Sequence, residues 1–156
     1  MKLFLLRHGK ATEGFENQKD FDRVLAGKGK KQSKKIGSYL KDTDIKYGLV
    51  SPAKRTQQTF DIINEHINIE SVYESPDLYL SSADVINDVI NQHVTASDIL
   101  VVGHNFGISD LVDFYTGINI NLSTCMLAII EFDAQSTAHF SRQGGRLLEV
   151  ISPKDL

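Results

Sequence analysis

Two histidines in this sequence each follow a short run of apolar residues. Leu3–Leu6 leads into Arg7 and His8, and Ile99–Val102 leads through a glycine into His104. Runs of this length are typical of buried strands. Ligands bind at the carboxyl ends of strands in open α/β sheets, so this placement indicates a functional site. A neutral imidazole can attack phosphorus, and a guanidinium can neutralise the oxygens of a transferring phosphoryl group.

A second arginine is predicted at the start of a helix. Ile45–Val50 is interpreted as a strand, and Ser51 and Pro52 follow as N-cap and first helical residue. Arg55 then lies in the first helical turn. A helix N-terminus already has free N–H groups and a partial positive charge, so a cation there gains nothing from the dipole. An arginine at this place is explained if an anion binds there.

Strands and helices alternate over the first two-thirds of the chain, which predicts a single-domain, three-layer α/β sandwich with a mostly parallel sheet. Parallel strands present their carboxyl ends at one edge, so Arg7, His8, Arg55 and His104 are expected to converge on one crevice. Such a site would suit a tetrahedral dianion, most simply phosphate. The other elements expected from apolar spacing are a helix opening at Gly27, a strand at Val72–Tyr73, a helix capped by Ser82, a helix capped by Asn105 and including Phe106, and edge strands at Cys125–Phe132 and Arg146–Ile151.

Composition narrows the classes of function. The 156 residues fit one domain spanning 1–156, and 17 basic against 20 acidic residues give a net charge of −3, which argues against a general nucleic-acid or anionic-membrane surface. Cys125 is the single cysteine and is expected to be buried. Neither a signal-peptide core nor a membrane-spanning run is present, so the expected location is cytoplasmic. The lysines after Gly27 are better explained as a solvated helix face than as a binding patch.

Metal and nucleotide cofactors are not expected. The histidines at 66, 93 and 139 have no ligand partners at metal-binding spacing, and no glycine-rich phosphate loop follows a strand. The polar stretch between Gly9 and Arg23 has no helical or strand period. Loops of this length are commonly lids, binding loops or disordered segments.

Three segments together resemble the histidine phosphatase, or phosphoglycerate mutase-like, superfamily. They are Leu6–Gly9, Ser51–Thr59 and Val102–Asn105, which match in order and in spacing. The short chain and Asp20–Leu25 are similar to the small phosphohistidine phosphatase branch, which lacks a large inserted helical subdomain. The resemblance implies that His8 becomes phosphorylated, whereas Arg7, Arg55 and His104 bind the phosphoryl oxygens.

The sequence departs from the family pattern at the expected proton donor. Many members have a glutamate at the position where this chain has Leu80, which cannot deliver a proton. Asp20, Asp77 and Asp84 are the carboxyl groups that could substitute, and the sequence does not choose among them.

The expected function is hydrolysis of a phosphoryl group, with protein phosphohistidine as substrate and without a cofactor. The alternatives are a small-molecule phosphomonoesterase, which needs a working acid, and a non-catalytic module that binds phosphate or a phosphopeptide. A binding module needs the arginines, but it does not need two histidines at strand ends. The partner is accordingly a phosphorylated protein or a small phosphorylated molecule, whereas the oligomeric state is left open.

Overall fold

The centre of the structure is a six-stranded sheet with strand order β3-β2-β4-β1-β5-β6. The computed structural model describes residues 1–156. The strands are β1 (Lys2–Arg7), β2 (Tyr47–Val50), β3 (Ser71–Glu74), β4 (Ile99–Gly103), β5 (Leu127–Phe132) and β6 (Gly145–Ile151). The helices are α1 (Gly27–Leu40), α2 (Lys54–Ile67), α3 (Ala83–Gln92) and α4 (Gly107–Thr116). The neighbouring strands β3, β2, β4 and β1 pair in parallel, while β5 pairs antiparallel with both β1 and β6.

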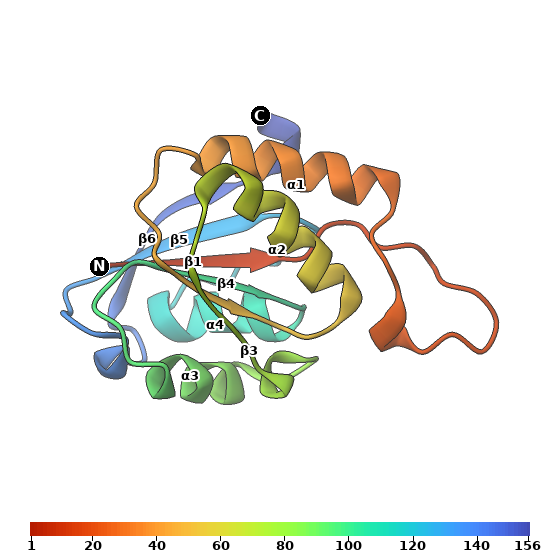
Figure 1. The fold of residues 1–156 in the computed structure, drawn as a ribbon. Coiled ribbons are helices and arrows are strands. Elements are labelled where there is room, and N and C mark those ends of the chain that lie inside the picture. Colours follow the sequence, from red (N-terminus) through yellow and green to blue (C-terminus); the bar gives the residue numbers. More distant parts are fainter.

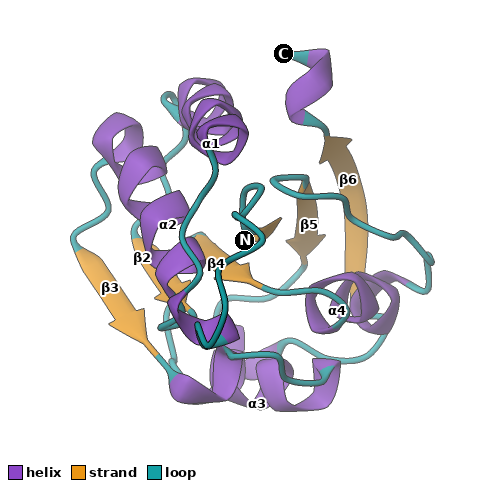
Figure 2. Cartoon of the chain, turned by 90° about the vertical axis from the view of Figure 1, so that its right-hand side faces the viewer, coloured by secondary structure: helices purple, strands orange, loops and turns teal.

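The helices form the two outer layers, with α1 and α2 on one face of the sheet and α3 and α4 on the other (Figures 1 and 2). Alternation along β1 explains this arrangement, because successive strand side chains point to opposite faces. Leu3 and Leu5 belong to the core under α3 and α4, whereas Phe4 and Leu6 belong to the core under α1 and α2. The predicted three-layer, mostly parallel α/β sandwich is therefore confirmed.

The register between β1 and β4 places the two histidines side by side. Arg7 is paired with Gly103, so His8 and His104 each follow the last residue of neighbouring parallel strands. Figure 2 looks onto these carboxyl ends, and Figure 1 shows the segment between β1 and α1 extending beyond the end of β1.

Two predicted helix caps are wrong. The Ser51 hydroxyl does not cap α2, which begins at Lys54. Asn105 does not cap α4, which begins at Gly107, and the Phe106 side chain is 74% exposed rather than packed on the helix face. In both cases the polar side chain binds a partner distant in sequence. The predicted Ser82 cap is confirmed, because its hydroxyl accepts a hydrogen bond from the Val85 amide.

Other elements differ only in extent or position. The strand predicted from Cys125 begins at Leu127 and lies between β1 and β6, so β6 alone forms that edge of the sheet. Cys125 is buried, as expected, and burial raises the pKa of its thiol to about 12. None of the helices is both long enough and apolar enough to cross a membrane.

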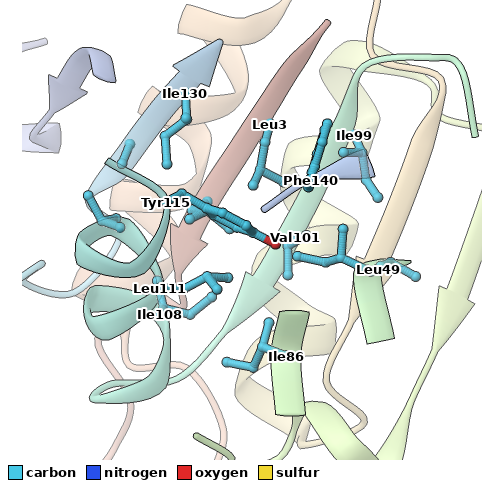
Figure 3. Close-up of a cluster of buried hydrophobic side chains, with 14 of the residues drawn as sticks. Leu3, Leu49, Ile86, Ile99, Val101, Ile108, Leu111, Tyr115, Ile130 and Phe140 are labelled. Carbon is cyan, nitrogen blue, oxygen red and sulfur yellow. The ribbon is translucent and has the colours of Figure 1, made fainter. Parts of the chain in front are cut away.

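Tyr115 is the largest fully buried side chain, and Figure 3 shows it among residues of α3, α4 and the sheet. Its hydroxyl donates to Asn87 Oδ1 at 2.7 Å, while its ring packs edge-on against Phe132 at a centroid distance of 5.1 Å. Tyr115 thus ties α4 to α3 and to β5.

Replacing Tyr115 should test this packing. Tyr115→Ala should lower the free energy of unfolding by about 3–5 kcal/mol, because it removes a buried aromatic ring and leaves a cavity. Tyr115→Phe should lower it by about 1 kcal/mol, because only one hydrogen bond is lost. Urea denaturation measures both effects, with Val94→Ala at a 64% exposed position as the control. A loss below about 1 kcal/mol for Tyr115→Ala would contradict the packing described.

Candidate active site

His8 is a buried imidazole whose orientation is set by its own backbone. Its Nδ1 lies 2.7 Å from the Gly9 carbonyl oxygen. A carbonyl only accepts, so Nδ1 carries the proton and Nε2 keeps its lone pair. Burial, together with the positive charges of Arg55, Arg7 and Arg23, lowers the pKa of His8 to about 4, although the Gly9 contact opposes the shift. The imidazole is therefore neutral at neutral pH.

Close backbone contacts position the segment that follows His8. The Gly9 amide donates to Thr59 Oγ1 of α2 at 3.0 Å. On the other side, a Cβ at Gly29 of α1 would lie 2.1 Å from the Lys10 carbonyl oxygen, and one at Gly9 would lie 2.8 Å from the Gly29 carbonyl oxygen. Only glycine permits such an approach. The end of β1 is consequently clamped between α1 and α2.

Arg55 lies in the first turn of α2, and its side chain reaches the unprotonated nitrogen of His8. The Arg55 Nε donates to His8 Nε2 at 3.2 Å. Its Nη1 donates to the Asp20 carbonyl oxygen at 2.8 Å, and its Nη2 donates to Asp20 Oδ2 at 2.9 Å. Arg55 is only 3% exposed, so the negative charge of Asp20 partly compensates a buried cation.

Asp20 is held as a carboxylate. Its Oδ2 accepts from the Tyr79 hydroxyl at 2.6 Å, and its Oδ1 accepts from Arg23 Nη1 at 3.0 Å. The Tyr79 hydrogen bond and those from Arg23 and Arg55 lower the pKa of Asp20 far below its usual range. A carboxylate stabilised in this way is a poor proton donor at neutral pH. We conclude that Asp20 orients Arg55 and Arg23.

His104 is the second imidazole of the site. Its ring centroid lies 5.2 Å from that of His8, and its Nε2 lies 2.7 Å from Ser51 Oγ. Ser51 Oγ accepts from the Ala53 amide at 3.4 Å and can donate its own hydrogen to His104 Nε2. In that tautomer the proton of the imidazole lies on Nδ1, which is buried and has no partner. Burial, His8 and Arg55 lower the pKa of His104 to about 3.

Arg7 is the last residue of β1, and its side chain is held by a backbone carbonyl. Its Nη1 donates to the Leu122 carbonyl oxygen at 3.0 Å, and Asn105 Nδ2 donates to the same oxygen at 2.8 Å. The Arg7 Nε is buried and has no partner. Burial and the charge of Arg55 lower the pKa of Arg7, yet a guanidinium stays charged in proteins.

A pocket of about 210 Å³ brings the four sequence-predicted residues Arg7, His8, Arg55 and His104 together. Its remaining lining residues are Lys10, Ala11, Arg23, Leu80, Asn105 and Thr124, and none of the lining residues is acidic. Asp77 and Asp84 are exposed and lie outside this lining. Leu80, which cannot deliver a proton, lines the pocket.

Sequence reasoning missed several members of the site. Lys10 and Arg23 come from the segment between β1 and α1, where no periodic pattern indicates which side chains face inward. Tyr79 packs edge-on against His104 at a centroid distance of 5.4 Å. Asn105 and Thr124 also line the pocket. The only sequence signals for them were that Asn105 directly follows His104 and that Thr124 shortly precedes β5.

The protonation of His8 gives a direct test of this geometry. In an NMR titration the His8 imidazole should titrate near pH 4 instead of the usual 6.5. Arg55→Ala should raise that pKa toward 6.5, because it removes a like charge and admits water. Lys30→Ala, on the exposed face of α1, is the control.

The same shift links protonation to stability. Between pH 6.5 and 4 the unfolded imidazole binds a proton that the folded one does not, so the free energy of unfolding should fall as the pH is lowered through this window. A wild-type His8 that titrates at 6.5 would contradict the buried, cation-surrounded site.

Known structures share the fold of this chain. The fold matches the structure of the protein histidine phosphatase SixA complexed with tungstate, with a TM-score of 0.82, 23% identity and 99% coverage of both chains. A protein designated phosphohistidine phosphatase SixA from Agrobacterium tumefaciens matches with a TM-score of 0.83, 22% identity and 97% coverage of both chains. An uncharacterised chloroplastic protein of Arabidopsis thaliana is 25% identical over 170 residues, covering 99% of this chain and 78% of that protein.

The family model described as histidine phosphatase superfamily (branch 1) matches residues 3–79, which include Arg7, His8 and Arg55. The second histidine, His104, lies beyond the matched segment and is brought to the same pocket by the pairing of β4 with β1. Residues 3–79 of the chain thus match the histidine phosphatase superfamily (branch 1), and the whole chain shares the fold of the SixA structure.

Proposed function

We propose that residues 1–156 form a phosphohistidine phosphatase domain that acts on protein phosphohistidine through a phosphorylated His8. The observation that carries this proposal is a neutral, oriented imidazole in a cationic pocket whose lining contains no carboxylate. The names of the SixA structures, which share the fold, support the same substrate class.

In the first step His8 Nε2 attacks phosphorus. A new P–N bond forms to His8 while the P–N bond to the substrate imidazole breaks, and the departing imidazole takes up a proton. Arg7 and Arg55 supply guanidinium donors for the phosphoryl oxygens, and His104 supplies its unpartnered Nδ1–H. Fixed donors of this kind stabilise the charge that develops in the transition state without reorganising.

In the second step water attacks the phosphorus of phosphorylated His8. The P–N bond to His8 Nε2 breaks, inorganic phosphate leaves, and the neutral imidazole of His8 is regenerated. The Gly9 carbonyl keeps Nδ1 protonated throughout, so the same nitrogen receives and releases the phosphoryl group.

The leaving group decides between phosphohistidine and a phosphate monoester. An alkyl phosphate leaves as an alkoxide, and a positioned proton donor is worth roughly 10²–10⁴-fold in its hydrolysis. The pocket has no such donor, because Asp20 is stabilised in its ionised form and Leu80 is at the donor position. An imidazole leaving group has a parent pKa of about 6.5 and can be protonated from solvent. The lining therefore favours phosphohistidine.

The covalent step predicts a specific phenotype for His8. His8→Ala should lower turnover more than 100-fold, equivalent to roughly 3 kcal/mol of barrier. Rapid quenching with substrate carrying a labelled phosphoryl group should trap acid-labile, base-stable label on the wild type and not on the variant. His139→Ala, an exposed histidine outside the pocket, is the matched control. Label that persists on His8→Ala would place the nucleophile elsewhere.

The absence of an acid in the lining predicts a ranking of substrates. Values of kcat/KM should fall from phosphohistidine to p-nitrophenyl phosphate to phosphoserine as the leaving group becomes more basic. Asp20→Asn should lower all three by a similar factor of about tenfold, about 1.4 kcal/mol, because it loosens Arg55 without removing a proton donor. A loss confined to phosphoserine would identify Asp20 as a general acid and would favour a phosphomonoesterase.

A further inference from the structure

A groove lined by basic residues continues from the active-site pocket along α1. A cavity of about 390 Å³ shares Arg7, Lys10 and Thr124 with the pocket, and Lys28 of α1 and Lys154 of the C-terminal segment line its other side. A further cavity of about 210 Å³ shares Lys28 and Lys154 and continues to Lys31 and Lys35. We call the surface formed by Arg7, Lys10, Lys28, Lys31 and Lys154 the basic groove.

The charge of the basic groove is not compensated within the protein. None of its five basic residues forms an ion pair, and neither of its cavities has an acidic side chain in the lining. The chain as a whole carries a net charge of −3, so this accumulation of cations is local. A cleft lined by one sign of charge concentrates ligands of the opposite sign.

The first turn of α1 has a positive side chain where the helix dipole favours a negative one. Helices favour acidic side chains in this turn because of the dipole, yet α1 has Lys28 there and no acidic residue. The buried Gln32 side chain joins the two sides of the groove: its Oε1 accepts from the Lys10 amide at 2.9 Å, and its Nε2 donates to Thr124 Oγ1 at 3.3 Å. Hydrogen bonds of Gln32 therefore fix the position of the groove lining, and only a negatively charged ligand can compensate the positive charge of the groove.

We propose that the basic groove docks an acidic segment of the protein that carries the phosphohistidine. This inference rests on the proposed function and deepens it, because it states what surrounds the substrate residue. The cavities extend well beyond the pocket that surrounds His8, so a lone phosphorylated side chain would leave them empty.

The dimensions fit an extended polypeptide. Lys28, Lys31 and Lys35 lie three and four residues apart and so share one face of α1, where seven residues rise about 10 Å. Three residues of an extended chain cover about the same length. Lys35 Nζ donates to the Pro153 carbonyl oxygen at 3.2 Å and is therefore engaged within the protein. Lys28 and Lys31 remain available to a ligand. No aromatic side chain lines either cavity, which leaves nucleotide bases without a stacking surface.

The test compares two double variants with the same change in charge. Lys28→Glu/Lys154→Glu reverses the charge of two of the five basic residues of the groove, and Lys30→Glu/Lys34→Glu reverses the charge of two exposed lysines of α1 that line neither of its cavities. Each is assayed for kcat/KM on free phosphohistidine, on a phosphohistidine peptide flanked by glutamates and on one flanked by glutamines. Circular dichroism and urea denaturation establish that each variant is folded.

The groove variant should lose about tenfold on the glutamate-flanked peptide. It should keep wild-type kcat/KM on free phosphohistidine and on the glutamine-flanked peptide. The loss should shrink at high salt, where surface charges are screened. Equal loss in the control variant, or no preference of the wild type for the acidic peptide, would overturn the proposal.

Binding separates this proposal from the proposed function. Fluorescence anisotropy with an unphosphorylated, glutamate-rich peptide should show weaker binding to the groove variant than to the wild type or the control. If that difference is found and no phosphohistidine is hydrolysed, the docking surface stands and the proposed function fails. If a single-stranded oligonucleotide binds more tightly than the acidic peptide and displaces it, the partner is a nucleic acid and the docking proposal fails.

Discussion

The parallel pairing of β1 with β4 is the constraint on which the site depends. Because Arg7 is opposite Gly103, two imidazoles emerge beside each other from the buried centre of the sheet. The strands are apolar on both faces and covered by helices, so their register cannot slip without exposing core residues. The stability of the whole sandwich thus holds the 5.2 Å separation of the rings of His8 and His104.

The arginines around His8 would repel one another without a nearby negative charge. Asp20 supplies it through contacts with Arg55 and Arg23, and the Tyr79 hydroxyl donates to the same carboxylate oxygen as Arg55. Burial alone would favour a neutral His8, and the arginines reinforce that preference. The same cations that lower the basicity of His8 also line the pocket with hydrogen-bond donors, so both properties have one structural cause.

The alternation of strands and helices was sufficient to predict the layers. Because parallel strands present their carboxyl ends at one edge of the sheet, the sequence was also sufficient to predict that Arg7, His8 and His104 lie close together. Two helix caps were mispredicted for a common reason. The Ser51 hydroxyl binds His104 and the Asn105 amide binds Leu122, and local capping patterns contain no information about partners that distant in the chain. Lys10, Arg23 and Tyr79 were missed because irregular segments have no period that distinguishes inward from outward side chains.

The pairing of Asp20 with Arg55 has a consequence for the end of each catalytic cycle. Both terminal nitrogens of Arg55 are already engaged by Asp20, one by the carboxylate and one by the carbonyl oxygen. Under the proposed function, inorganic phosphate then competes with an internal anion for this guanidinium and gains less affinity than it would from an unpaired one. A carboxylate tethered in the site in this way limits inhibition by the product and favours release of phosphate.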